Sequence, residues 1–136
     1  MAAVRRILGT VAGMAALART RGVRVGIARV SGRSMEPTLH QGDRLLVLYG
    51  VPPRAGGMAV VRLPAHDQDH PVDRPLAVKR VTGRSPHAVH HWWIDRDNPH
   101  EGVDSWQVGP IPDHDVKARV LLRMPDMPMS IRRRLG

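Results

Sequence analysis

The chain has no cysteine and no phenylalanine, and tyrosine and tryptophan together number only four among its 136 residues. Without cysteine the protein has no disulfides and no thiolate metal sites, and its redox compartment is left undetermined. Because aromatic side chains are so scarce, we expect the core to be built from Val, Leu, Ile, Ala and Met. A chain of this length can bury one hydrophobic core but not two, so we expect a single domain.

Lysine is also scarce, since only Lys79 and Lys117 accompany 19 arginines among the 21 basic residues. A retained lysine indicates a site where the ammonium has to do what a guanidinium cannot, and losing a proton is the obvious candidate. Lys79 lies in the strand-like run 76–81, where alternation places it on one face with Ala77 and Val81. Burial there would lower the pKa of its amine. The alternative is a lysine that extends its ammonium to solvent from a half-exposed strand.

Acidic residues are missing from both ends of the chain. Residues 1–35 hold seven arginines and no acid, and the last ten residues hold three more arginines. The remaining 11 basic residues face 12 acidic ones, so the net charge of +9 belongs to the two ends. The middle offers no basic face with interleaved aromatics, which argues against a nucleic-acid partner. The partner we expect for the basic ends is an anionic membrane surface, and solvated arms are the alternative.

Long hydrophobic runs are absent, and the longest uncharged apolar stretch is residues 7–18, between Arg6 and Arg19. As a helix it would be about 18 Å long, short of the roughly 30 Å hydrocarbon core of a bilayer. It can lie in the interface, span marginally, or be a signal-like segment ending at Ala18. We expect residues 1–22 to form a basic and apolar segment, helical in part, that associates with the cell membrane. A cytoplasmic location is the alternative.

Short strands separated by turns rich in Gly, Pro and Asp account for the rest of the chain. No window outside the N-terminal run shows a helical period, and there is no internal repeat. We therefore predict an all-β domain over residues 23–125, followed by a basic tail over residues 126–136. Its strands are expected at 23–30, 44–49, 58–63, 76–82, 90–95 and 116–123.

A serine on a constrained turn is the strongest chemical candidate. Ser34 follows the predicted strand 23–30, and the flanking Gly32 and Pro37 keep helix or strand from continuing through it. Such a turn exposes the hydroxyl and the backbone N–H of Ser34 at one point, as nucleophilic attack and oxyanion stabilisation both require. The alternative is that the segment is only a turn, for which serine and glycine are common residues.

Three short segments share their composition and order with one known family. They are Ser34-Met35-x-Pro37-Thr38-Leu39-x-x-Gly42-Asp43, then Lys79-Arg80-Val81, and finally Asp97-Asn98 with Asp104-Ser105, Gly109 and Ile111-Pro112. In this order, over roughly residues 30–120, they resemble the nucleophile box, the general-base box and the last box of the signal peptidase I family. Its members are serine–lysine endopeptidases that remove leader peptides. The resemblance implies an all-β fold of coiled antiparallel sheets, of the signal peptidase and LexA-like type.

By this resemblance Ser34 is the nucleophile and Lys79 the general base of an endopeptidase that needs no cofactor and no metal. The turn from Gly32 to Ser34 would supply the oxyanion hole, mainly through backbone N–H. An ion pair between Arg80 and Asp104 is also implied, and the substrate would be a precursor protein with an N-terminal leader peptide. The residues expected to bind substrate or support the site are Met35, Pro37, Arg80, Asp97, Asn98, Asp104 and Ser105.

The chain departs from the family pattern at four positions. Arg96 stands where the family usually has glycine, and Gly102 where the best-known members have a serine that orients the lysine amine. Trp106 replaces an arginine, and Gly57 replaces an aspartate. None of these changes removes the nucleophile or the base. They do raise an alternative, a weakened relative or a non-catalytic, membrane-associated binding module on the same fold.

The short length, the segment Gly42-Asp43-Arg44-Leu45-Leu46-Val47 and the Asn98-Pro99 continuation of the last box resemble one subgroup, the nickel-type superoxide dismutase maturation proteases. A LexA-like self-cleaving module is another alternative, but it needs a DNA-reading domain and a cleavable linker, and only 33 residues precede Ser34. The histidines at 66–70 and 87–91 lack the geometry of a closed ligand set, so no metal site is predicted.

Overall fold

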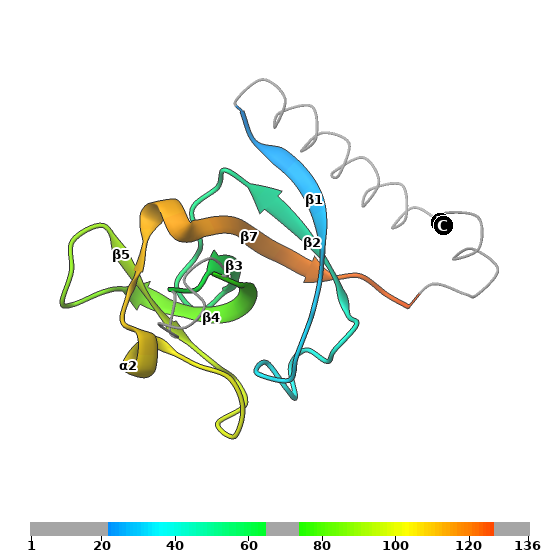
Figure 1. Ribbon diagram of the computed structural model, residues 1–136. Helices are drawn as coiled ribbons and strands as arrows, with labels where there is room; N and C mark the ends of the chain where they lie inside the picture. The colour runs from blue at the N-terminus through cyan, green and yellow to red at the C-terminus, as the bar shows by residue number, and fades with distance from the viewer. Residues whose placement is uncertain (1–21, 65–73, 127–136) are drawn as a thin grey trace.

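The computed structural model describes residues 22–64 and 74–126, which form strands with two very short helical turns (Figure 1). The helix α2 covers Ser105–Val108, and the 3-10 turn η1 covers Asp113–Asp115. The predicted all-β fold class is confirmed. The strands are β1 (Arg24–Arg29), β2 (Arg44–Tyr49), β3 (Met58–Arg62), β4 (Leu76–Arg84), β5 (His91–Asp95), β6 (Ile111–Pro112) and β7 (Val116–Arg123).

All seven strands belong to one antiparallel sheet in the order β1-β2-β7-β3-β4-β5-β6. The sheet is coiled rather than flat: in Figure 1, β1 and β2 lie on one side, β5 with α2 lies on the other, and β7 runs between them. Its register shifts where β2 and β3 meet β7, and again between β4 and β5. Such bulges increase the local twist and bend a strand, which accounts for the coiling.

Six of the strands follow the predicted segments closely, because alternating apolar residues and flanking turns are strong local signals. The sequence did not predict α2, η1 or β6, which are two to four residues long and too short to show a period. α2 depends instead on a capping box. The Asp104 side chain accepts from the Trp106 N–H, and the Gln107 side chain accepts from the Asp104 N–H.

The predicted helical segment over residues 7–18, the basic tail and the histidines at 66–70 lie outside the described residues. Within residues 22–64 and 74–126, no helix is long and apolar enough to cross a membrane. The domain limits expected at residues 23 and 125 stay predictions.

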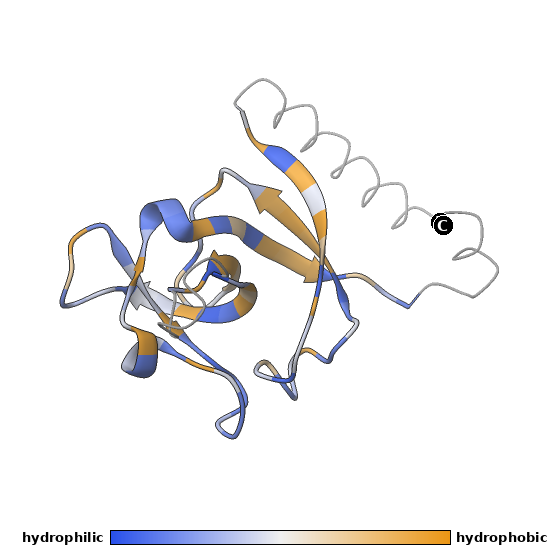
Figure 2. Ribbon diagram, in the orientation of Figure 1, coloured by the Kyte–Doolittle hydropathy of each residue, from blue (hydrophilic) through white to orange (hydrophobic). Residues whose placement is uncertain are grey.

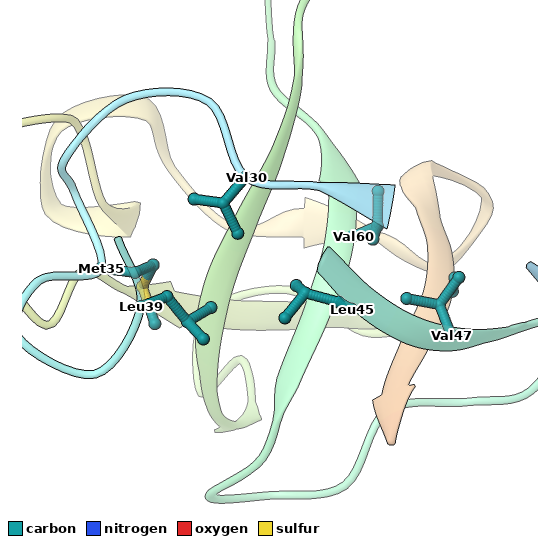
Figure 3. Packing of buried hydrophobic residues seen from close by; sticks show 7 residues of the cluster. Val30, Met35, Leu39, Leu45, Val47 and Val60 are labelled. Atoms are coloured by element: carbon teal, nitrogen blue, oxygen red, sulfur yellow. The ribbon is translucent and has the colours of Figure 1, made fainter. Parts of the chain in front are cut away.

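One hydrophobic cluster joins the sheet to the turn that follows β1. Buried side chains of the sheet, among them Leu45, Val47 and Val60, pack with Met35 and Leu39 from the turn (Figure 3). Met35 and Leu39 are 1% and 2% exposed. Burial of apolar area, worth about 25 cal/mol per Å² removed from water, therefore anchors the turn on the sheet. It also sets the position of the residue that adjoins Met35, which is Ser34.

A second cluster lies between β3, β4, β5 and β6, and Lys79 sits at its edge. On β4, Lys79 shares a face with the fully buried Val81, and on β3 it pairs with the fully buried Ala59. Lys79 itself is 2% exposed, so the alternative of a lysine reaching for solvent does not apply. In Figure 2, hydrophobic residues are concentrated on the strands and hydrophilic residues on the turns. The cluster comprises Ala59, Val61, Val81, Trp92, Ile94 and Ile111.

We expect Met35→Ala to lower the free energy of unfolding by about 2–5 kcal/mol, because it leaves a cavity between the turn and the strands. Urea unfolding followed by circular dichroism measures the loss. Leu122→Ala, at a β7 residue that is 45% exposed, is the matched control and should change stability by about 0.5 kcal/mol or less. A loss at Met35 no larger than the loss at Leu122 would contradict the anchoring of the turn.

Candidate active site

The segment between β1 and β2 closes on itself and presents Ser34. The Val30 N–H donates to Asp43 O, and the Gly42 N–H donates to Val30 O, both at 2.8 Å, so the two ends of the segment are fastened together. The Asp43 carboxylate accepts from the His40 N–H at 2.8 Å. Gly42 has a φ of 89°, a conformation that favours glycine. These contacts explain why a Gly-Asp pair ends the nucleophile box.

Ser34 is half-buried, and the last box holds its backbone. Ser34 O accepts from the Asn98 N–H at 2.8 Å, and the Asn98 side chain donates to Arg33 O at 2.9 Å. Among the residues that the structure describes, no acceptor takes the N–H of Ser34. Because this N–H and the hydroxyl belong to one residue, an oxyanion formed by attack of the hydroxyl lies close enough to accept from the N–H. Gly32, with a φ of 86°, contributes no side chain to the turn.

Lys79 is held on β4, where its amine is desolvated. Burial lowers the pKa of this amine below the ordinary lysine value, because desolvation penalises the charged form. The Arg96 guanidinium lowers the pKa further, whereas the Asp104 carboxylate opposes both effects by favouring the ammonium. The balance is downward, so the site favours an amine that can act as a base.

Ser34 and Lys79 meet at Gly102. A Cβ placed on Gly102 would lie 2.5 Å from Ser34 Cβ, 3.5 Å from Ser34 Oγ and 3.1 Å from Lys79 Nζ. The hydroxyl and the amine therefore border the same small space, and their separation cannot exceed the sum of the last two distances. In the part of the chain that the structure describes, no hydrogen bond joins the Ser34 hydroxyl directly to the Lys79 amine. Glycine is the residue that this approach permits, because any side chain at position 102 would collide with Ser34.

The guanidinium of Arg80 holds the carboxylate of Asp97. Arg80 Nε and Nη2 donate to the two Asp97 oxygens at 3.2 and 2.6 Å, and the Thr38 hydroxyl donates to the same carboxylate at 2.5 Å. The predicted ion pair between Arg80 and Asp104 is therefore wrong. Strand pairing places Arg80 opposite Asp95, two residues from Asp97, whereas Asp104 lies farther along the chain at the start of α2.

The Asp97 carboxylate joins the last box to the nucleophile turn, because Thr38 belongs to that turn. The hydrogen bond from Arg80 lowers the pKa of Asp97, desolvation opposes this, and the hydrogen bond from Thr38 lowers the pKa further.

Two residues of the nucleophile turn that were expected to bind substrate or support the site differ in their exposure. Pro37 is exposed and follows a cis peptide bond, whereas Met35 lies in the core and faces no open surface.

Asp104 and Ser105 are buried and hold the backbone around the site. One oxygen of Asp104 caps α2, and the other lies 3.4 Å from Nε of Arg96. Ser105 Oγ accepts from the Ile94 N–H at 2.8 Å and so joins α2 to β5. The structure therefore gives both residues supporting contacts within the protein.

Arg96 is the residue whose contacts the sequence did not reveal. It stood out only as a departure from the family pattern, yet its guanidinium contacts both Asp104 and the backbone O of Gly102. No periodicity or motif signals such a contact, since it depends on how the loop between β5 and α2 folds. Trp106, another departure, is 80% exposed and packs edge-to-face on Trp93 with ring centroids 5.1 Å apart.

A cleft of about 220 Å³ with a mixed polar and apolar lining opens between β1 and the first half of β4. Among the described residues no strand pairs with the second edge of β4 there, because Leu76 to Val78 pair with β3 while β5 pairs with β4 only from Arg80 onwards. An open strand edge beside a cleft can accept an extended peptide as an added strand. The cleft is lined by Ala28, Arg29, Ser31, Tyr49, Val60, Leu76, Ala77 and Val78.

In the described ranges, no three His, Asp or Glu side chains gather closely enough to hold a metal ion. Of the second histidine group, His87 packs edge-to-face on Trp93, and His91 Nδ1 lies 2.7 Å from Val89 O. His87 and His91 therefore contact residues in or next to β5 rather than each other.

Gly102→Ala should destabilise the protein more than Gly109→Ala. The two glycines have φ values of 84° and 82°, so both substitutions cost about 1–3 kcal/mol of backbone strain. Only at Gly102 would the new Cβ collide with Ser34, which adds an overpacking cost of about 1–3 kcal/mol. At Gly109 nothing described lies within 4 Å of that position. Urea unfolding of both variants measures the difference, and equal losses would contradict the close approach of Gly102 to Ser34.

Asp97 should make stability depend on acid pH. Its pKa in the folded state lies below the ordinary value of 3.8, so its contribution is present above that value and is lost as the pH falls through the folded-state pKa. The difference in unfolding free energy between the wild type and Asp97→Asn should therefore be constant near neutrality and shrink below about pH 4. Urea unfolding across this range tests it, with the exposed Asp126→Asn as control. A difference that did not change with pH would contradict the Arg80–Asp97 contact.

Comparison with known proteins agrees with this geometry. A family model described as signal peptidase, peptidase S26, matches residues 2–92, which include both Ser34 and Lys79. The mouse (Mus musculus) mitochondrial inner membrane protease subunit 1 is 24% identical over 116 residues, an alignment that covers 73% of this chain and 69% of the mouse protein. With the family model matched over more than half of its length, the chain belongs to the signal peptidase family, peptidase S26, and is a protease of the signal-peptidase type.

Proposed function

We propose that this protein is a serine endopeptidase in which Ser34 is the nucleophile and Lys79 the general base. The observation that carries the proposal is that a serine from a turn and a buried lysine from a strand border the same space at Gly102. Burying an amine costs free energy unless its charge is paired or given up, so a lysine at this position is expensive for stability alone. A catalytic role explains why the chain keeps a buried lysine here, because burial lowers the pKa of the amine and lets it act as a base.

The chemistry would use these groups in turn. The neutral amine of Lys79 takes the proton of the Ser34 hydroxyl while the Ser34 oxygen bonds to the peptide carbonyl carbon. The carbonyl oxygen becomes an oxyanion, to which the Ser34 N–H donates. When the C–N bond breaks, the leaving amine takes the proton from Lys79 and an ester remains on Ser34. Lys79 then takes a proton from a water molecule whose oxygen attacks the ester. When the ester C–O bond breaks, the new carboxyl end is released and the Lys79 ammonium returns the proton to the Ser34 oxygen, which restores the hydroxyl and the neutral amine.

The substrate we propose is the N-terminal leader peptide of a precursor protein, bound in extended form. The open edge of β4 from Leu76 to Val78 ends next to Lys79, so a peptide added there leads towards the site. The adjoining cleft is small, and aliphatic side chains such as Ala28, Val60 and Ala77 form part of its lining, which suits small side chains before the cut. Support for a leader peptide as substrate also comes from membership of the signal peptidase family.

We further propose that the protein works at an anionic membrane surface through residues 1–22, with the protease domain at 23–125 and a basic tail at 126–136. The supporting observations are the seven arginines of residues 1–35 and the uncharged run between them. The mouse relative is, by its name, a subunit of an inner membrane protease. The segment Gly42 to Val47 and the Asn98-Pro99 continuation of the last box support the finer assignment to the nickel-type superoxide dismutase maturation proteases.

Lys79→Arg should reduce cleavage by at least about a hundredfold, and as severely as Ser34→Ala. Arginine keeps the charge and approximate length of lysine but cannot give up its proton, so it cannot act as a base. The wild-type rate should rise with pH through the lowered pKa of Lys79, because only the unprotonated amine accepts a proton. Purified precursor proteins that carry leader peptides are incubated with each variant, and mass spectrometry identifies the products.

Lys117→Arg is the matched control, because it makes the same change at the other lysine of the chain. It should keep the wild-type rate. A Lys79→Arg protein that retains most of its activity would end the general-base assignment. Failure of the wild type to cleave any precursor would favour the non-catalytic binding module instead.

A further inference from the structure

Arg96 makes two contacts that connect the Ser34–Lys79 site to the carboxylate of Asp104. Its Nη1 donates to Gly102 O at 2.7 Å, and its Nε lies 3.4 Å from Oδ2 of Asp104. The Arg96 side chain is 19% exposed and that of Asp104 only 11%. Charges in such surroundings are screened by solvent and salt less than those of an exposed pair, so each acts more strongly on its neighbours.

The contact with Gly102 bears on the geometry of the site. Gly102 approaches Ser34 and Lys79 so closely that a Cβ there would lie within 3.5 Å of both functional atoms. The loop that carries Gly102 is held at Asn98, whose N–H donates to Ser34 O at 2.8 Å, whereas closer to Gly102 the Glu101 N–H reaches Asn98 O only at 3.5 Å. The hydrogen bond from Arg96 to Gly102 O therefore helps to hold this part of the loop close to Ser34 and Lys79.

The contact with Asp104 bears on the charge of the site. Two charged groups act on Lys79: the Arg96 guanidinium favours the neutral amine, and the Asp104 carboxylate favours the ammonium. Within the described part of the chain, Arg96 is the only cation paired with Asp104. Without that partner, desolvation alone would oppose the effect of the carboxylate on the lysine.

We propose that Arg96 is a positioning residue for the site: its guanidinium neutralises Asp104 and holds Gly102 against Ser34 and Lys79, which keeps the amine free to act as a base. The inference rests on the proposed function and deepens it, by assigning control of the base to a residue outside the Ser34–Lys79 pair. It also explains two departures from the family pattern together. The chain has Trp106 where the pattern has arginine, and it supplies a guanidinium from position 96 instead.

The test observes the lysine directly. Because Lys79 and Lys117 are the only lysines, full-length protein labelled with ¹³C-lysine gives two Cε signals, which Lys117→Arg assigns. Their shifts are followed by NMR from neutral to alkaline pH in the wild type, in Arg96→Met, and in Arg96→Met combined with Asp104→Asn. Asparagine at 104 keeps an acceptor for the cap of α2. We expect the titration midpoint of Lys79 to rise in Arg96→Met and to fall back in the double variant.

The second readout is the pH dependence of precursor cleavage by the same proteins. In Arg96→Met the rising limb of the rate should move to higher pH by the same interval as the NMR midpoint, with a tenfold lower rate on that limb for each unit. A merely structural role would lower the rate at every pH without moving the limb. Arg84→Met removes a guanidinium that is 55% exposed at the far end of β4, and it should move neither readout.

An unchanged Lys79 midpoint in Arg96→Met would overturn the inference. A double variant whose Lys79 midpoint equals that of Arg96→Met would overturn it as well. Midpoints that move as expected in proteins that cleave no precursor would support the action of Arg96 on Lys79 and reject the proposed protease mechanism. If Arg96→Met does not fold, Asp104→Asn alone decides. Removal of the carboxylate should lower the Lys79 midpoint below that of the wild type, and an unchanged midpoint would overturn the inference.

Discussion

The burial of one amine among apolar strands is the constraint on which the rest of the site depends. Lys79 is placed there by strand alternation, between Val81 on its own strand and Ala59 on the neighbouring one. A charged amine in this position is costly, and the surroundings lower its pKa rather than pair it with a carboxylate of its own. The coiled sheet therefore supplies more than a scaffold, because its second hydrophobic cluster sets the chemical state of the lysine.

The serine, by contrast, is placed by contacts on two sides of a turn. On one side of the turn, Met35 and Leu39 pack into the first hydrophobic cluster. On the other, the N–H of Asn98 donates to the backbone O of Ser34. The same loop continues to Gly102, which approaches both the hydroxyl and the amine. The last box is thus the element that brings serine and lysine to one place, although it supplies neither. The contacts of Asn98 and Gly102 therefore determine whether the hydroxyl and the amine can act together.

The sequence predicted those features that depend on local pattern. The strands, the burial of Lys79 and the turn at Ser34 follow from alternation and from glycine and proline signals, all within a few residues. It failed where partners are distant in the chain. Arg80 pairs with Asp97 rather than Asp104, and Arg96 takes the contact with Asp104, because strand register and loop path decide which carboxylate each guanidinium reaches. The four-residue α2 was missed because a capping box holds it rather than a periodic face.

The most direct test of the Ser34 nucleophile is to trap the ester that its attack on a peptide would form. A precursor is mixed with the protein, the reaction is quenched with acid during turnover, and the protein is digested with trypsin. Cleavage after Arg33 and Arg44 releases a peptide that contains Ser34. We expect this peptide to carry the mass of the leader fragment in the wild type and to lack it in Ser34→Ala. An adduct on a different peptide, or undiminished cleavage by Ser34→Ala, would contradict a serine nucleophile at this position.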